Sequence, residues 1–243
     1  MVDGIIIVPT YNEIENIEKL IREIFSQPRE FHILVVDDNS PDGTASRVRT
    51  LQAEFPEKLF IEERTGKTGL GTAYIHGFKW ALAHSYDFIF EMDADFSHNP
   101  EDLVRLYNTC RREGADLAIG SRYVTGVNVI NWPMNRVLLS WLASKYVRFI
   151  TGMDIHDTTA GFVCYRREVL ERIDLKKIQF VGYAFQIEMK FKTYLLNYNL
   201  KEVPVIFTDR TRGTSKMSGS IIYEAVFGVI KMKVKSLFNR IKL

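Results

Sequence analysis

Short apolar runs alternate with stretches of helical periodicity through the first 95 residues, and this alternation constrains the fold more than any other feature. Strands are expected at residues 4–9, 31–36 and 59–62, and in a fourth run that ends at Asp93. Between these runs, apolar residues recur every three or four positions, as they do on one face of a helix. Strands that alternate with helices are typical of a mostly parallel sheet with helices on both faces. The sequence therefore predicts an α/β fold with a Rossmann-like sheet.

Helix starts carry recognisable signals after the first two strands. Asn12 is placed to act as an N-cap, with Glu15 three residues later. Ser40 and Pro41 suit the N-cap and the first position of a second helix. Helical periodicity returns over residues 65–84, 134–150 and 183–196 and again at the C-terminus.

Length and composition favour one large domain. The 243 residues contain no linker, repeat or low-complexity stretch, so we expect a single α/β domain with a C-terminal extension. A net charge of +2 speaks against bulk nucleic-acid binding. Two cysteines do not form a disulfide framework, which fits a reducing cytosol. The N-terminus reads as a strand and not as a signal peptide, and no uncharged apolar run reaches the ~20 residues that span a bilayer.

Two aspartates separated by one residue end the fourth apolar run. Side chains alternate along a strand, so Asp93 and Asp95 are expected on the same side. Neighbouring carboxylates suit a hard divalent cation such as Mg²⁺ or Mn²⁺, which shares its oxygen ligands with substrate phosphates. A nucleotide diphosphate is the substrate class that this pattern favours. The alternative is a pair of solvated aspartates at a strand end, without a ligand.

Three strands of the predicted sheet end in polar residues. In open α/β sheets, ligands bind beyond the carboxyl ends of the strands, so Tyr11-Asn12-Glu13, Asp37-Asp38 and Asp93-Ala94-Asp95 can converge on one crevice. Carboxylates at two of these ends can accept hydrogen bonds from ribose or base, while the third holds the metal. Each segment taken alone is also compatible with a turn or a cap. The Asp37-Asp38 pair also suggests a phosphoacceptor receiver domain, which the length and the second half of the chain disfavour.

The ordered motifs of this chain resemble those of the dolichol-phosphate (polyprenol-phosphate) mannose synthases, which are inverting family 2 glycosyltransferases with the GT-A fold. The resemblance extends to about Gly219, which implies a GT-A catalytic domain over residues 1–219 and a basic amphipathic helical extension over residues 220–243. It is carried by Pro9-Thr10-Tyr11-Asn12-Glu13, Val36-Asp37-Asp38-Asn39-Ser40-Pro41-Asp42-Gly43-Thr44, Gly69-Leu70-Gly71-Thr72-Ala73-Tyr74-Ile75-His76-Gly77, Met92-Asp93-Ala94-Asp95-Phe96-Ser97-His98, Gly120-Ser121-Arg122-Tyr123, Asn131-Trp132-Pro133, Asp157-Thr158-Thr159-Ala160-Gly161-Phe162, Gly182-Tyr183-Ala184-Phe185-Gln186-Ile187-Glu188-Met189, Glu202-Val203-Pro204-Val205 and Asp209-Arg210-Thr211-Arg212-Gly213-Thr214-Ser215-Lys216-Met217.

The resemblance implies a role for each matching residue. The nucleoside of GDP-mannose would be held by Pro9, Tyr11, Glu13, Val36 and Asp38. The diphosphate would be bound through Mg²⁺ or Mn²⁺ by Asp93, Ala94 and Asp95, with Arg122, Arg210 and Lys216 on its oxygens. Arg136 and Ser140 would receive the phosphate of a polyprenyl or dolichyl phosphate. Ser97 stands where some family members carry a glutamine as a further metal ligand.

The expected chemistry fits these residue types. A phosphate monoester has its second pKa near ~6 and is already largely dianionic at neutral pH, so the acceptor needs a cationic pocket and no general base. Candidates for that pocket are Arg122, Arg136, Arg210, Arg212 and Lys216, although for Arg212 alone an ordinary solvated arginine is the favoured alternative. His76, His98 and His156 lack metal-ligand spacing and are expected to cap loops or to pack. Glu188 suits either a structural or a site role.

Two segments predict contact with a membrane surface. Over residues 134–150, apolar residues recur at helical spacing with basic residues between them. Near the C-terminus the same pattern places one apolar stripe among lysines, formed by Ile230, Val234, Leu237, Phe238 and Ile241. A basic amphipathic helix can lie in a lipid interface. The alternative is a terminal helix packed on the domain or on another subunit.

These expectations define a peripheral enzyme on the cytoplasmic face of a membrane, with a membrane-anchoring subunit as a possible partner. It would transfer mannose from GDP-mannose to a polyprenyl phosphate. The alternatives are a UDP-glucose-dependent polyprenyl-phosphate glucosyltransferase and a catalytically silent sugar-nucleotide-binding subunit. Intact Asp93, Asp95 and Arg122 argue against the silent subunit.

Overall fold

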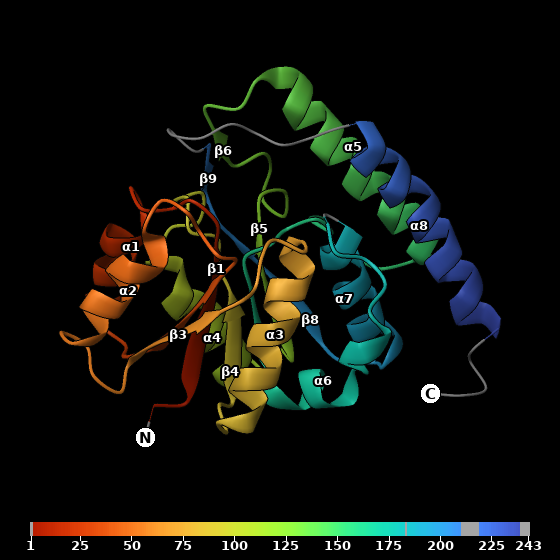
Figure 1. Cartoon of the computed structure of the whole chain (residues 1–243). Helices are drawn as coiled ribbons and strands as arrows, with labels where there is room; N and C mark the ends of the chain where they lie inside the picture. Colours follow the sequence, from red (N-terminus) through yellow and green to blue (C-terminus); the bar gives the residue numbers. More distant parts are fainter. Residues whose placement is uncertain (1, 183, 210–218, 239–243) are drawn as a thin grey trace.

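A mostly parallel, seven-stranded sheet forms the centre of the computed structural model, which describes residues 2–182, 184–209 and 219–238 (Figure 1). The strand order is β3-β2-β1-β4-β7-β5-β8, and only β7 runs antiparallel to its neighbours. The strands are β1 (Gly4–Thr10), β2 (His32–Asp37), β3 (Leu59–Glu63), β4 (Phe88–Glu91), β5 (Leu117–Ser121), β7 (Val163–Arg166) and β8 (Leu200–Pro204). A separate two-stranded ribbon pairs β6 (Val129–Ile130) with β9 (Phe207–Thr208). The predicted sheet class is confirmed.

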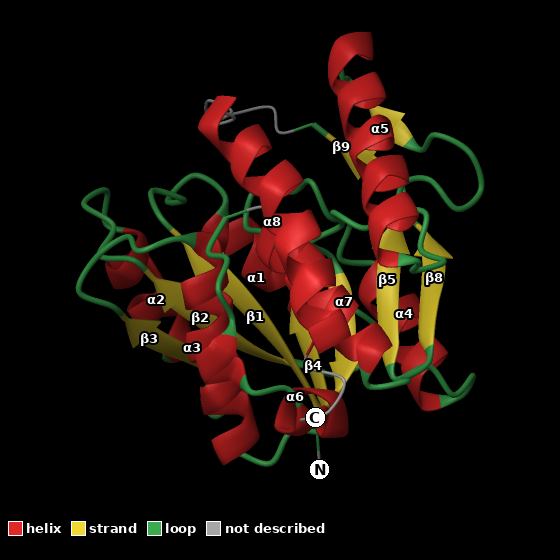
Figure 2. Ribbon diagram, turned by 90° about the vertical axis from the view of Figure 1, so that its right-hand side faces the viewer, coloured by secondary structure: helices red, strands yellow, loops and turns green. Residues whose placement is uncertain are grey.

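Helices cover both faces of the sheet (Figures 1 and 2). One face carries α3 (Leu70–Ala83), α6 (Arg167–Arg172) and α7 (Ala184–Leu195), and the other carries α1 (Ile17–Phe25), α2 (Thr44–Gln52) and α4 (Asp102–Arg111). Strand residues alternate between the two cores, with Ile5 and Ile7 in the first and Ile6 in the second. Gly77 lets α3 approach β1 closely, since a Cβ there would lie 2.6 Å from Ile7.

Two long helices, α5 (Met134–Thr151) and α8 (Gly219–Phe238), lie side by side beyond the sheet (Figures 1 and 2). Helix α8 contacts α5 and α7 and buries Val229 and Met232. Gly228 allows this close packing, because a Cβ there would lie 2.7 Å from the Phe180 ring. Among the described residues, no helix combines the length and apolarity that crossing a bilayer requires.

Three local expectations were wrong. Helix α1 begins at Ile17, and Asn12 adopts a left-handed conformation with φ 61° in the preceding loop. Helix α2 begins at Thr44 after Gly43, and Ser40 instead donates its hydroxyl to Asp37 Oδ2 at 2.6 Å. Short polar side chains bind nearby carboxylate groups as readily as they cap helices, which explains the error at Ser40. Strand β4 ends at Glu91, so Asp93 and Asp95 belong to the following loop.

Candidate active site

A cavity of about 390 Å³ opens beyond the carboxyl ends of β4 and β5. Six sequence-predicted residues line it together, namely Asp93, Asp95, Ser97, Arg122, Arg136 and Ser140. The predicted nucleoside residues Pro9, Tyr11, Glu13, Val36 and Asp38, and Ala94, are not part of this lining. Arg210, Arg212 and Lys216 lie outside the described residues.

The loop after β4 places two carboxylates on the cavity wall. Asp93 Oδ1 accepts a hydrogen bond from the Tyr74 hydroxyl at 3.1 Å. Asp95 Oδ1 accepts from the Ser97 hydroxyl at 2.6 Å and from the Ser97 amide at 3.1 Å. Phe96, which lies between Asp95 and Ser97 in the chain, has φ 61°, a left-handed conformation that turns Ser97 back onto Asp95.

This donor set fits a hard divalent cation that is shared with a substrate. No group of three or more His, Cys, Asp or Glu side chains suited to a metal occurs among the described residues, so Asp93 and Asp95 would be the principal protein ligands. Mg²⁺ is usually held by one or two carboxylates and completes its shell with waters and substrate phosphates. Ser97 is positioned to orient Asp95 and thereby supports the set.

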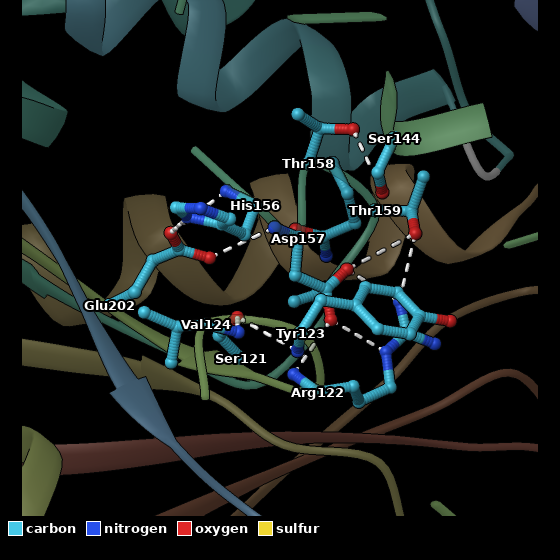
Figure 3. Close-up of polar contacts among 12 residues, drawn as sticks. Ser121, Arg122, Tyr123, Val124, Ser144, His156, Asp157, Thr158, Thr159 and Glu202 are labelled. Carbon is cyan, nitrogen blue, oxygen red and sulfur yellow. Dashed lines mark hydrogen bonds and ion pairs between the residues drawn. The ribbon is translucent and has the colours of Figure 1, made fainter. Parts of the chain in front are cut away.

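Arg122 follows β5 and is held in place by a buried carboxylate (Figure 3). Its Nε donates to Asp157 Oδ2 and its Nη2 donates to Asp157 Oδ1, both at 2.6 Å. Nη2 also donates to Thr159 Oγ1 at 2.8 Å. Glu202 in turn accepts from the backbone amides of His156 and Asp157 at 2.8 and 2.9 Å. The guanidinium is therefore fixed on the cavity wall before any ligand binds.

The Asp157 carboxylate is ionised in this setting. Burial alone would raise the pKa of Asp157, but the charge and hydrogen bonds of Arg122 outweigh burial and lower the pKa below its ordinary value of 3.8. Both charges of the pair are thus retained although Arg122 is only 7% exposed and Asp157 is fully buried.

Helix α5 brings a second arginine to the cavity. Arg136 donates from Nη1 to Asp209 at 2.8 Å, and its guanidinium carbon lies 4.0 Å from the centroid of the Trp132 ring. Ser140 lies four residues later on α5, on the same side of the helix, and also lines the cavity. The pair offers a cation and a hydroxyl to an anionic group.

The strand ends of β1 and β2 form a separate polar region. Asp38 accepts from Arg64 Nε at 2.6 Å, whereas Asp37 is fully buried and accepts from the Thr10 hydroxyl at 2.8 Å. The Lys67 ammonium lies 4.6 Å from the centroid of the Tyr11 ring. Asp37 therefore has a structural role. The Val36 side chain belongs to the core, so any nucleoside contact at this position falls to its main chain.

The other end of the cavity is apolar. Its walls come from three helices and comprise Leu139, Leu142, Ala143, Tyr146 and Val147 of α5, Ile187 of α7 and Val226 of α8. The Tyr146 hydroxyl donates to the Val226 carbonyl at 2.9 Å and joins α5 to α8. One cavity thus connects carboxylates and arginines to an apolar channel.

The histidine prediction is confirmed for His98, and Glu188 has a structural role. The His98 ring is buried, accepts from the Asp93 amide through Nδ1 at 3.1 Å and stacks on Phe162. Burial lowers the pKa of His98 to about 4, so the ring is neutral at pH 7. Glu188 accepts from the amides of Gln179 and Phe180 at 2.8 and 3.1 Å and is not part of the cavity lining.

Sequence reasoning missed several polar residues around the cavity. Asp157, Gln186 and Glu202 were named only as members of the family motifs and were given no role of their own, and neither Glu91 nor Lys190 was given one. One signal was present for Glu91, because a carboxylate inside the otherwise apolar run 88–92 has to find a partner in the interior. The others depend on contacts between distant segments.

Comparisons with known proteins agree with this geometry. The sequence profile described as Glycosyl transferase family 2 matches residues 5–174. A polyprenol monophosphomannose synthase of Mycolicibacterium smegmatis is 47% identical over 97% of this chain and 89% of its own length. An undecaprenyl-phosphate mannosyltransferase of Micrococcus luteus is also 47% identical, over 93% of this chain and 91% of its own length.

Solved structures support the fold. A mannosyltransferase from Pyrobaculum calidifontis, in complex with GDP-Man and Mn²⁺, superposes with a TM-score of 0.58 at 19% identity over 97% of this chain and 74% of its own. At that identity the likeness concerns the fold alone, which is GT-A. The resemblance to the polyprenol-phosphate mannose synthases is confirmed, and the chain belongs to glycosyl transferase family 2.

Proposed function

We propose that this protein transfers mannose from GDP-mannose to a polyprenyl phosphate, with inversion at the anomeric carbon. The observation that carries the proposal is a single cavity with Asp93, Asp95 and Arg122 at one end and apolar residues of α5, α7 and α8 at the other. A nucleotide sugar suits the first end and a lipid phosphate suits the second. The relatives named above act, by their names, on polyprenyl phosphates and transfer mannose.

The donor would lie along the carboxyl ends of β1, β2 and β4. Its nucleoside is assigned to Pro9, Tyr11, Glu13, Val36 and Asp38, and its diphosphate to Asp93, Ala94 and Asp95 with Arg210 and Lys216. Asp38 is already oriented by Arg64, which prepares its carboxylate for hydrogen bonds from the nucleoside.

Departure of the nucleotide builds negative charge on the diphosphate. Mg²⁺ or Mn²⁺ held by Asp93 and Asp95 would supply Lewis-acid stabilisation of that charge. Arg122 adds charge-assisted hydrogen bonds from a fixed position, because Asp157 and Thr159 hold its guanidinium. A hydrogen-bond donor that is already oriented needs little reorganisation when the charge develops.

The phosphate of the acceptor is itself the nucleophile. The dianionic phosphate binds Arg136 and Ser140, which reduces its repulsion from the donor diphosphate. No proton has to be removed from it, and His98 is unsuited to remove one because its Nδ1 accepts a hydrogen bond from the Asp93 amide. Attack on the face opposite the leaving group inverts the anomeric carbon.

The helix pair α5 and α8 is proposed to face the cytoplasmic side of a membrane. Large apolar side chains stand exposed on both helices, including Leu142 at 56%, Phe149 at 86% and Leu237 at 58% exposure. Lys145 lies beside Trp141 on α5, with its ammonium 5.1 Å from the ring centroid. An apolar face flanked by lysines suits the boundary between headgroups and acyl chains. In this proposal residues 1–219 form the catalytic domain and residues 220–243 extend its membrane-facing side.

The test supplies two labelled donors, GDP-mannose and UDP-glucose, to the purified protein with Mg²⁺ and vesicles that contain a polyprenyl phosphate. We expect label from GDP-mannose to become lipid-soluble and label from UDP-glucose to stay in the water phase. Transfer from UDP-glucose would replace the donor assignment. Absence of transfer from both donors, with GDP-mannose still bound, would favour a silent sugar-nucleotide-binding subunit.

A further inference from the structure

A lysine is fully buried beneath the cavity. Lys190 on α7 is 0% exposed, and its Nζ donates to the Ala160 carbonyl at 2.6 Å. Nζ also lies 3.3 Å from both the backbone carbonyl and the side-chain Oε1 of Gln186. Lysine is almost never fully buried unless it is paired. The residue therefore belongs to a polar cluster inside the protein.

The partner charge is Glu91, at the end of β4. Glu91 is also 0% exposed, and its Oε2 accepts from Gln186 Nε2, so the Gln186 amide connects the two charged groups. Burial lowers the pKa of Lys190 to about 8 and raises that of Glu91 to about 7. The other charged groups that face Lys190 are Asp157, Arg122 and Glu202.

The cluster reaches the cavity through backbone and not through Lys190 itself. Ala160 and Gln186 line the cavity, whereas Lys190 does not. Thr159, next to Ala160, accepts the hydrogen bond from Arg122 Nη2 (Figure 3). The Lys190 ammonium therefore fixes a carbonyl one residue away from a direct partner of Arg122.

We propose that Lys190 is a positioning residue for the transfer reaction, because its contact with Ala160 keeps Thr159, and through it Arg122, aligned with the bound diphosphate. The effect on rate depends on the proposed function, whereas the effect on the backbone does not. A lysine that only stabilised the fold would change stability and turnover together. If the lysine instead positions other residues, a variant can lose turnover while it keeps its stability.

The variant designed to separate stability from turnover is Glu91→Gln/Lys190→Met. Removing one member of a buried pair is strongly destabilising, but replacing both charges is often neutral for stability. Gln at position 91 still offers an acceptor to Gln186, while the Ala160 carbonyl loses its donor. We expect a melting temperature within about 4 °C of the wild type, an unchanged Kd for GDP-mannose, and a kcat lowered at least ~10-fold by misalignment. Wild-type kcat in a variant of wild-type stability would overturn the proposal.

The matched control is Lys192→Met, the same substitution two residues later on α7. Lys192 is partly exposed, donates to the Lys177 carbonyl at 3.2 Å and pairs with Glu188, all away from the cavity. Its kcat is expected to remain within about twofold of the wild type, as for most surface substitutions. Lys190→Arg retains a charged donor for Ala160, and we expect its kcat to exceed that of the double variant. A folded Lys190→Arg protein that is no more active would contradict the proposal.

Hydrogen exchange tests the positioning without any turnover. In the double variant, peptides that span residues 157–162 should exchange at least about tenfold faster, while those from β5 stay unchanged. Equal exchange in both proteins would refute the role of Lys190 even if the enzyme is active. Faster exchange combined with a wild type that transfers no mannose would leave the positioning intact and reject the proposed function instead.

Discussion

The two ends of the cavity are built in different ways. At the carboxylate end, charged side chains are held by hydrogen bonds to fixed partners, as Arg122 is by the buried Asp157 and Asp95 is by Ser97. At the apolar end, α5 and α8 provide the wall. Helix α8 docks through a narrow strip that includes Val229, while Phe238 on another side stays 78% exposed. Fixed polar contacts are concentrated where charge would develop in the proposed reaction, and exposed apolar surface is concentrated where a lipid would enter.

This contrast fits the demands of the two proposed ligands. A departing diphosphate is stabilised most by donors that do not reorganise, which favours buried and fully paired groups. A prenyl chain requires only apolar contact, which two helices provide without polar partners. Substitutions at the first end should therefore change turnover, and substitutions at the second end should change how the enzyme meets its acceptor and the membrane.

The largest expected effect is that of Asp95→Ala. Removing this carboxylate takes away a proposed metal ligand, so turnover should fall about 1000-fold, on the scale of losing several kcal/mol of leaving-group stabilisation. The measurements are lipid-linked product formation and calorimetric binding of GDP with and without Mn²⁺. Asp87→Ala, at the opposite end of β4, is the control and should keep full activity. Undiminished transfer in excess EDTA would refute the metal assignment.

Asp157→Asn should reduce both turnover and stability, because it leaves the buried Arg122 without its counter-charge. Breaking such a pair costs about 3–5 kcal/mol in unfolding free energy, and the misplaced guanidinium should lower kcat by about 100-fold. Denaturant unfolding and steady-state kinetics measure the two effects. A stable variant with normal kcat would show that Arg122 needs no partner at this end of the cavity.

The same pair predicts a pH dependence of stability. Because the pKa of Asp157 is lowered in the folded protein, its contribution is fully present well above the ordinary value of 3.8 and is lost as the pH falls through the lower folded value. As the pH falls from 3.8 towards the lower folded pKa, the wild type should therefore lose stability more steeply than Asp157→Asn. If the free energy of unfolding fell with the same slope in acid for both proteins, the lowered pKa of Asp157 would be contradicted.

Arg136→Ala tests the junction between the two ends. The acceptor phosphate loses a cation, so the KM for polyprenyl phosphate should rise about tenfold while the Kd for GDP-mannose stays the same. Arg148→Ala is the control on the same helix, since Arg148 pairs with Asp154 at 2.6 Å and does not line the cavity. An equal loss in donor affinity would place Arg136 at the donor.

The smallest effect is expected on the outer surface of α8. Ile230 and Val234 are 41% and 45% exposed, so Ile230→Ser/Val234→Ser should leave the melting temperature nearly unchanged. Binding to anionic vesicles should weaken about fivefold as apolar contact is lost. Val229→Ser, at a fully buried position, should instead lower the melting temperature. Equal vesicle binding by wild type and double variant would favour a helix that only packs.

The sheet and much of the polar end were predictable because they depend on local patterns. Apolar runs defined the strands, and the Asp93-Ala94-Asp95 spacing identified the carboxylates even though β4 ends at Glu91 and not at Asp93. The predicted apolar stripe of α8 is exposed where the structure describes it, as Ile230 and Leu237 show, although the helix also packs on α5 and α7.

The remaining contacts join residues far apart in the chain. Arg122 and Asp157 are separated by 35 positions, and Glu91 and Gln186 by 95. No periodicity records such pairs, since each depends on how β7 and α7 are placed beside β4 and β5. The misplaced helix starts at Asn12 and Ser40 have a different cause, because the Ser40 hydroxyl donates to Asp37 and accepts from the Asn12 backbone amide.

The central claim is that one cavity binds two unlike ligands. The most direct test offers labelled GDP-mannose together with one of two acceptors, a polyprenyl phosphate or the free prenol of the same chain length. Both carry the same apolar chain, and only the first supplies a dianionic nucleophile to Arg136 and Ser140. The account predicts transfer to the phosphate and none measurable to the prenol. Equal transfer to both would show that a base activates a hydroxyl, which contradicts the proposed chemistry.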